Sequence, residues 1–178
     1  MRSRMFVAAV VAASALCGAS ALAQQVTKDQ VPGIRNLARI ETTVACAGAI
    51  TPESVVEVKK MGFVSVVNLR LATEEGAEVE KEAAAAKAAG IRYFHVPYDG
   101  SADPKAADAF LTAITTKGAK PAFIHCAGGN RAATMWLIKR IAIDHWDVDR
   151  ATMEATLLGQ TNPTMRQFAI DYAQSHRR

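Results

Sequence analysis

The residues best suited to chemistry lie in one glycine-rich turn, Ile124-His125-Cys126-Ala127-Gly128-Gly129-Asn130-Arg131-Ala132-Ala133. Small residues allow consecutive backbone N–H groups to curl around one anion, and the helix expected to begin at Arg131 adds the positive end of its dipole. The same field favours the thiolate form of Cys126, which makes this side chain a nucleophile. Arg131 can bind a tetrahedral oxyanion through two parallel hydrogen bonds. The pattern predicts a nucleophilic cysteine in an oxyanion cradle, because an inert buried cysteine would leave the arginine and the helix start as coincidences.

Alternating strands and helices are expected to position this turn. The apolar, β-branched segment 63–69 predicts a strand that is buried on both faces. The remaining elements are expected as strands at 42–47, 92–96 and 121–125 and helices at 53–61, 75–89, 106–117, 131–145, 148–158 and 163–175, after a polar lead-in at 24–36. This alternation predicts an α/β fold, a three-layer sandwich with a mainly parallel four- to five-stranded sheet flanked by helices. Ligands of such sheets bind at the carboxyl ends of the strands, where Cys126 is expected.

The turn resembles the H-C-x-x-G-x-x-R signature of the cysteine-dependent protein phosphatases. The matching residues are His125, Cys126, Gly129 and Arg131, with four residues between cysteine and arginine where the signature has five. The C-x-x-G-x-R form is also similar to the loop of rhodanese-type sulfurtransferases, in which a shorter loop surrounds a persulfide. The motif therefore indicates an oxyanion-binding cysteine and leaves the reaction open.

The flanking segments favour the phosphatases. Residues 61–70 (Met-Gly-Phe-Val-Ser-Val-Val-Asn-Leu-Arg) and 90–97 followed by Asp99 resemble strands of bacterial dual-specificity-like phosphatases. Residues 47–53 and 136–140 resemble the opening and the post-loop helix of that group. The resemblance spans about residues 31–158 and is closest to the beta-lactamase-hydrolase-like phosphatase family, and it implies a phosphotyrosine-phosphatase-like fold. The Gly-His-Ile-Pro-Gly-Ala element expected of a rhodanese is absent from the sequence.

The resemblance implies a reaction through a phosphocysteine. Cys126 would attack phosphorus, while Arg131 and the loop N–H groups of Ala127, Gly128, Gly129 and Asn130 would bind the phosphate oxygens. Asp99 lies where the family's general-acid loop begins, so it is the first candidate for the acid that protonates the leaving oxygen. Asp103 is the second candidate, although its position before Pro104 also suits a helix N-cap.

One departure from the family concerns the residue after the arginine. Phosphatases of this type usually have Ser or Thr there, and its hydroxyl helps the cysteine to leave. This chain has Ala132 and Ala133, and the first hydroxyl is that of Thr134. We therefore expect slow hydrolysis of the phosphocysteine, or an activity redirected to another anion or sulfane sulfur.

Three further residues are candidates for supporting roles. We expect His125 to hydrogen-bond local backbone and so orient the loop. Arg70 ends the segment 61–70 and would either bind substrate or pair with Glu74 or Glu75. A reversible disulfide between Cys46 and Cys126 would require Cα atoms within about 7 Å, and we expect the strands that carry them not to be neighbours.

The composition bounds the class of protein. The chain has 178 residues, of which 50% are hydrophobic and 21% charged, and a formal net charge of +4, which is ordinary for a globular protein. No stripe of Lys and Arg follows any segment, so we expect no nucleic-acid partner. The cysteines show no C-x-x-C and no zinc spacing, and we expect no metal and no cofactor.

The N-terminus has the pattern of a secretory signal peptide. Arg2 and Arg4 precede an apolar, alanine-rich run, and Ala21-Leu22-Ala23 forms an A-x-A exit. Cleavage after Ala23 would remove residues 1–23 and leave 24–178 as a single phosphatase-like domain, periplasmic or secreted, without stable membrane insertion. An uncleaved anchor is the alternative, but the many alanines make this run a poor membrane span.

These observations predict a cysteine-dependent phosphatase of the protein tyrosine or dual-specificity type that hydrolyses phosphomonoesters. Its substrate would be a phosphorylated protein or a small-molecule phosphate ester. Two alternatives remain open: a sulfurtransferase that uses a Cys126 persulfide, and a catalytically weak pseudophosphatase that binds an oxyanion.

Overall fold

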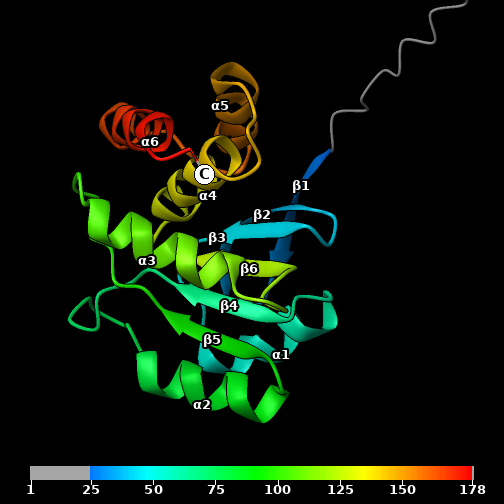
Figure 1. The fold of residues 1–178 in the computed structure, drawn as a ribbon. Coiled ribbons are helices and arrows are strands. Elements are labelled where there is room, and N and C mark those ends of the chain that lie inside the picture. The colour runs from blue at the N-terminus through cyan, green and yellow to red at the C-terminus, as the bar shows by residue number, and fades with distance from the viewer. Residues whose placement is uncertain (1–24, 178) are drawn as a thin grey trace, which may run out of the picture.

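In the computed structural model, which describes residues 25–177, six strands form one mixed sheet (Figure 1). Their order across the sheet is β1-β2-β3-β6-β4-β5. The strands are β1 (Val26–Val31), β2 (Ile34–Ile40), β3 (Val44–Ala47), β4 (Ser65–Asn68), β5 (Arg92–His95) and β6 (Ala122–His125). The four strands β3, β6, β4 and β5 are mutually parallel, so the predicted mainly parallel α/β sandwich is confirmed. The signal peptide predicted for residues 1–23 lies outside the described residues.

An antiparallel hairpin at the start of the described chain was not predicted. Strands β1 and β2 pair antiparallel, and β2 continues antiparallel onto β3. The turn between them contains Pro32 and Gly33, and Gly33 has a φ of 78°, a conformation that glycine adopts without strain. The expectation of a polar lead-in at 24–36 was wrong because β1 is an edge strand whose polar residues face solvent. The hairpin extends the sheet beyond the predicted four to five strands.

Helices cover both faces of the sheet. On one face lie η1 (Pro52–Ser54), α1 (Val55–Lys60) and α2 (Val79–Ala89), packed on a core that includes Val66 and Phe123. On the other face lie α3 (Pro104–Thr115), α4 (Asn130–Ala142), α5 (Val148–Leu157) and α6 (Pro163–Ser175). Helix α4 is covered along its length, and α5 and α6 pack against it (Figure 1). This is the expected three-layer arrangement.

The largest helix correction concerns the segment that follows β4. We predicted a helix over 75–89, but α2 begins only at Val79. Residues 71–78 instead form an irregular turn that starts with the backbone N–H of Leu71 donating to the Glu74 carboxylate at 2.9 Å. As predicted, α2 ends at Gly90, whose φ of 68° is left-handed. The turn therefore holds Glu74 at the carboxyl end of the sheet.

None of the helices between residues 25 and 177 is both long and apolar enough to cross a membrane.

Candidate active site

The nucleophile candidate and the arginine flank one pocket at the carboxyl ends of the parallel strands. Cys126 directly follows β6, and Arg131 is in the first turn of α4. The pocket has a volume of about 420 Å³ and is lined by Leu71, Glu74, Asp99, Cys126, Gly128, Asn130, Arg131 and Met165. It thus brings together several residues predicted from the sequence, and adds Glu74 and Met165, to which the sequence assigned no place in the site.

The loop is held from outside through its carbonyl groups. Three successive carbonyls accept hydrogen bonds: Ala127 from Ala49 N–H at 3.0 Å, Gly128 from the Asn36 side-chain amide at 3.1 Å, and Gly129 from Ala133 N–H at 3.1 Å. In a trans peptide the N–H points opposite to the C=O. The N–H groups of Gly128, Gly129 and Asn130 are therefore turned away from these partners. That of Gly129 donates to Cys126 Sγ at 3.1 Å, which is the arrangement an anion cradle requires.

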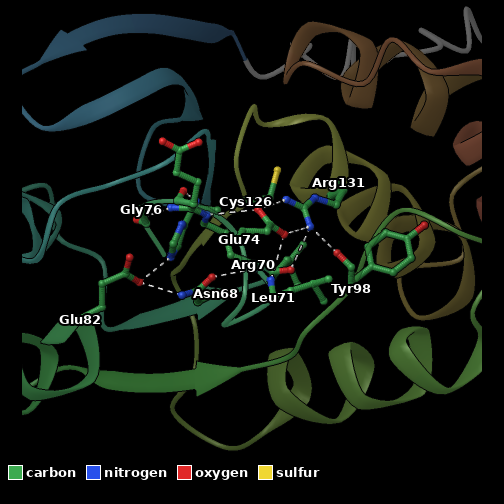
Figure 2. Close-up of polar contacts among 12 residues, drawn as sticks. Asn68, Arg70, Leu71, Glu74, Gly76, Glu82, Tyr98, Cys126 and Arg131 are labelled. Carbon is green, nitrogen blue, oxygen red and sulfur yellow. Dashed lines mark hydrogen bonds and ion pairs between the residues drawn. The ribbon is translucent and has the colours of Figure 1, made fainter. Parts of the chain in front are cut away.

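Arg131 is fixed by a carboxylate that the sequence did not identify as its partner. Its Nη1 lies 2.6 Å from Glu74 Oε1 and its Nη2 lies 2.9 Å from Glu74 Oε2 (Figure 2). Nη1 also donates to the carbonyl of Tyr98 at 2.6 Å. The guanidinium also interacts with the Cys126 side chain, so the edge that Glu74 does not occupy adjoins the thiol and lines the pocket. Such an edge can bind two oxygens of a tetrahedral anion.

The charge of Glu74 is maintained by its partners. Hydrogen bonds from Arg131, the largest cause, and from the Leu71 N–H lower the pKa of Glu74 to about 2, against the opposing effect of burial. Both hydrogen bonding and a nearby positive charge favour the ionised carboxylate. Glu74 is thus an anion throughout the neutral and mildly acidic range, and its pairing with Arg131 persists there.

Arg70 pairs with protein groups and does not line the pocket. Its guanidinium contacts Glu74 Oε2 at 3.3 Å and the backbone carbonyls of Glu75 and Gly76 (Figure 2). The side chain is buried. Of the two roles considered from the sequence, these contacts favour pairing with Glu74, and Arg70 supports the turn that carries the Arg131 partner.

The two acid candidates occupy different environments. Asp99 is exposed and lines the pocket, and hydrogen bonds from Ser101 hold its pKa below the ordinary value. Asp103 caps α3: its carboxylate accepts from the N–H groups of Lys105 at 2.9 Å and Ala106 at 3.2 Å. Asp99 is therefore the carboxylate that can reach a ligand in the pocket, and Asp103 stabilises a helix start.

His125 does not have the backbone partner that we expected. Consecutive residues at the end of a strand point to opposite faces, so its ring lies on the face opposite to Cys126, buried against Glu82 of α2. Nε2 lies 3.1 Å from Glu82 Oε2 without the alignment of a hydrogen bond, and neither ring nitrogen has a hydrogen-bond partner within residues 25–177. Glu82 also accepts from Asn68 at 2.8 Å and from the Tyr93 hydroxyl at 3.0 Å. These four residues, Asn68, Glu82, Tyr93 and His125, form a polar cluster on the face of the sheet opposite to Cys126.

The hydroxyl of Thr134 is engaged in its own helix. It donates to the carbonyl of Asn130 at 2.9 Å, and the residue is buried. Ala132 and Ala133, which precede it, are also buried and carry no polar atom. Thr134 therefore does not replace the hydroxyl that the phosphatase signature places directly after the arginine.

Cys46 is closer to Cys126 than the sequence suggested. Strand β3 pairs directly with β6, so the expectation of non-neighbouring strands was wrong. Cys46 is opposite Ile124, two residues before Cys126, which puts their Cα atoms about 8 Å apart by the usual strand spacings. Both thiols are free and buried, and burial, together with the nearby Cys126, raises the pKa of Cys46. A disulfide would need a shift of the strands, because its Cα atoms must approach within about 7 Å.

Comparison with solved structures gives the same fold. A putative phosphatase from Shewanella putrefaciens superposes with a TM-score of 0.66 and 18% identity, covering 82% of this chain and 96% of that one. The core catalytic domain of the PP-IP phosphatase SIW14 from S. cerevisiae superposes with a TM-score of 0.61 and 17% identity, covering 80% and 88%. The fold is thus that of the tyrosine-phosphatase-like proteins.

Sequence comparison identifies the family. A beta-lactamase hydrolase-like protein of Agrobacterium fabrum is 32% identical over 105 residues, which are 56% of this chain and 24% of that protein. The match therefore spans about a quarter of the length of this relative. The family model described as "Beta-lactamase hydrolase-like protein, phosphatase-like domain" matches residues 36–143, from β2 to the end of α4. Because that match covers more than half of the chain, the protein belongs to this phosphatase-like domain family.

Proposed function

We propose that the protein is a cysteine-dependent phosphatase that hydrolyses phosphomonoesters, of the protein tyrosine or dual-specificity type, through a phosphocysteine. The observation that carries the proposal is the loop itself. The Gly129 N–H is directed at Cys126 Sγ, and Arg131, which also interacts with the Cys126 side chain, lines the same pocket. Donors fixed in advance around a nucleophile are what a phosphoryl-transfer transition state requires, because its charge is spread over three equatorial oxygens.

In the first step, the thiolate of Cys126 attacks phosphorus. An S–P bond forms while the P–O bond to the leaving group breaks, and the leaving oxygen takes a proton from Asp99. The N–H groups of the loop and the edge of Arg131 that Glu74 does not occupy hold the three equatorial oxygens. Glu74 contributes by holding the guanidinium at its other edge, so the arginine does not have to reorganise when the anion binds.

In the second step, water attacks the phosphocysteine. The S–P bond breaks, the electron pair returns to Cys126, and the Asp99 carboxylate accepts the proton of the water. Inorganic phosphate and the free thiolate result. No hydroxyl follows Arg131 to assist the departing sulfur, since Ala132 occupies that position and Thr134 donates to Asn130. We expect this step to be the slower one.

A sulfurtransferase is the second candidate, and the length of the loop favours it. Four residues separate Cys126 from Arg131, which is the spacing of the rhodanese-type loop. In that reaction the thiolate would attack the outer sulfur of thiosulfate, forming an S–S bond and releasing sulfite. The persulfide would then pass its outer sulfur to a thiol or cyanide acceptor. Asp99 would have no part in such a reaction, because no oxygen leaving group needs a proton.

The deciding experiment compares two substrates with the fully reduced protein. Release of para-nitrophenol from para-nitrophenyl phosphate, abolished by Cys126→Ser, is expected for the phosphatase. Formation of thiocyanate from thiosulfate and cyanide, with no ester hydrolysis, would show that the protein is a sulfurtransferase and not a phosphatase. If neither reaction proceeds and sulfate or phosphate still protects Cys126 from alkylation, the protein is an oxyanion-binding pseudophosphatase. A Cys46→Ser variant is the matched control, since it removes the buried thiol of the neighbouring strand β3 and leaves Cys126 in place.

A further inference from the structure

One peptide unit of the loop depends on a side chain from a distant strand. The peptide between Gly128 and Gly129 presents its carbonyl to the Asn36 side-chain amide at 3.1 Å, and its N–H to Cys126 Sγ at 3.1 Å. The two bonds leave the same rigid plane in opposite directions. Any rotation that releases the Asn36 contact therefore also withdraws the N–H from the sulfur.

The neighbouring peptides do not have this dependence. The carbonyl of Ala127 is bound by the backbone of Ala49, and the carbonyl of Gly129 is bound within helix α4 by Ala133. Both partners are backbone groups, so side-chain substitutions do not remove them. The Gly128–Gly129 peptide is the one in this stretch whose carbonyl is held by a side chain.

The same peptide is also the easiest to rotate. It lies between two glycines, which have no Cβ to restrict φ and ψ. A Cβ at Gly128 would meet nothing within 4 Å, so the loop has free space on that side. Gly129 has a φ of 102°, a region open to glycine. Gly128 also pairs with Gly48 in an isolated antiparallel bridge, so the Asn36 amide adds a side-chain contact to this backbone pairing and fixes the orientation of a peptide that its glycines leave adaptable.

Backbone pairing places Asn36 of β2 next to the Gly128 carbonyl. The preceding residue, Arg35, donates its N–H to Ala49 at 3.0 Å and accepts from Gly48 at 2.7 Å. Asn36 has a φ of 49°, a left-handed conformation that asparagine tolerates better than most residues. Its side chain is exposed and makes no core contact. The position is thus defined by backbone pairing, and the side chain is free to serve the loop.

We propose that Asn36 is a positioning residue that keeps the Gly128–Gly129 peptide oriented with its N–H toward Cys126 and the bound anion. The effect of this orientation on turnover rests on the proposed function, whereas the hydrogen bond from the Gly129 N–H to Cys126 Sγ does not depend on it. An amide is required, because a donor must face the carbonyl of Gly128. A carboxylate at the same place would repel that carbonyl and attract the N–H of Gly129, which reverses the peptide.

The test measures how strongly the loop favours the thiolate. The variants are Asn36→Ala and Asn36→Asp, with Gln30→Ala on the adjacent strand β1 as the control for loss of an exposed amide. The readout is the rate of alkylation of Cys126 by iodoacetamide at pH 7 divided by the rate at pH 10. Mass spectrometry of the peptide that contains Cys126 separates it from Cys46. This ratio reports the thiolate fraction and would not respond to a merely structural substitution.

We expect Asn36→Ala to lower the ratio several-fold, because the N–H loses its fixed orientation, and Asn36→Asp to lower it about tenfold or more, because the carboxylate also draws the N–H away from the sulfur. Gln30→Ala should match the parent protein. Equal ratios for all four proteins, or an Asn36→Asp ratio no lower than that of Asn36→Ala, would overturn the proposal. If the parent protein hydrolyses no phosphate ester but the ratios fall as stated, the proposed function fails and the role of Asn36 stands.

Discussion

Glu74 and Arg131, 57 residues apart in the chain, form a two-point ion pair with N···O distances of 2.6 and 2.9 Å. The carboxylate lies in an irregular turn after β4, and the guanidinium lies at the start of α4. Because β4 and β6 are neighbours in the sheet, their carboxyl ends bring the two residues together. The pair determines which edge of the arginine is left for a ligand.

Removing the charge of Glu74 should weaken catalysis without unfolding the protein. In Glu74→Gln, the amide can accept from one nitrogen of Arg131 but cannot accept from both, so the guanidinium loses its fixed orientation. We expect kcat/KM to fall, by less than the roughly 100- to 1000-fold loss that follows removal of a donor that touches the anion directly. Glu75→Gln, at the exposed neighbouring position, should retain the parent value. Equal kinetics for the two variants would refute the role of Glu74.

The pH dependence of this pair follows from the depressed pKa of Glu74. The pKa is about 2 when folded, against about 4.3 for an unperturbed glutamate. Stability contributed by the ionised carboxylate is therefore fully present above the unfolded value and is lost as the pH falls toward about 2. Urea unfolding of the parent protein and Glu74→Gln between pH 7 and pH 3 should show their difference in unfolding free energy shrink only below about pH 4.5. A difference that already disappears near pH 6 would contradict the assignment.

Substitution of Asp99 should alter the kinetics, whereas substitution of Asp103 should alter the free energy of unfolding. Asp99→Asn should lower kcat/KM, which reports the first step, about 100-fold for alkyl phosphates, a typical contribution of general acid catalysis, and lower it less for para-nitrophenyl phosphate because its leaving group needs less protonation. Since hydrogen bonds from Ser101 hold the pKa of Asp99 below its ordinary value, rates for alkyl esters should rise as the pH is lowered from 7. Stopped assays with both ester types measure this.

The matching changes at Asp103 should alter stability and not turnover. Asp103→Ala removes the N-cap of α3 and should cost about 1 kcal/mol of unfolding free energy, whereas Asp103→Asn retains a capping side chain and should cost less. A large kinetic loss in Asp103→Asn, with normal kinetics in Asp99→Asn, would exchange the two assignments.

Slow hydrolysis of the phosphocysteine should appear as a burst. Because Ala132 offers no hydroxyl and the Thr134 hydroxyl is bound to Asn130, the first turnover of para-nitrophenyl phosphate should be faster than those that follow. Stopped-flow absorbance with excess substrate should give about one equivalent of para-nitrophenol per active site before the steady state. A linear trace from the start would show that sulfur–phosphorus cleavage is not limiting.

The polar cluster around Glu82 should matter for stability. Glu82→Ala would leave Asn68, Tyr93 and His125 without the carboxylate that all three face in the interior. Asn68 and Tyr93 keep their mutual hydrogen bond at 2.8 Å but lose a shared acceptor, and an unsatisfied buried polar group costs about 1–3 kcal/mol, so we expect a loss of about 1–3 kcal/mol in unfolding free energy. Urea denaturation measures it, with the exposed Glu80→Ala in the same helix as the control. A loss below about 1 kcal/mol would contradict the importance of these contacts.

Local patterns sufficed to predict the parallel part of the sheet and the position of the Cys126 loop at its carboxyl end. The segment around Val66 and Val67 is apolar and β-branched, which identifies a buried strand. The two glycines before Arg131 predict an anion-binding loop, because the conformation that such a loop needs depends on residues adjacent in the sequence. We expected His125 to bond to the loop backbone and did not use strand alternation, which places its ring on the face opposite to Cys126.

The missed features depend on relationships between distant segments. Nothing local marks Glu74 as the partner of Arg131, because the pairing is created by the order of the strands. The same order makes Cys46 a neighbour of the loop strand. The hairpin was missed because residues 26–31 carry polar side chains that face solvent on an edge strand, where composition resembles that of a loop.

Segments near both ends of the described chain contact the Cys126 loop or line its pocket. Asn36 comes from β2, whereas Met165 comes from the first turn of α6, and Thr161 just before that helix accepts from the Asn130 side chain at 2.8 Å. During translation the loop is therefore synthesised well before the residues that enclose it. The ribosome must reach beyond Met165 before Cys126 acquires its complete surroundings, so a stalled or prematurely terminated chain carries this thiol in an incomplete pocket.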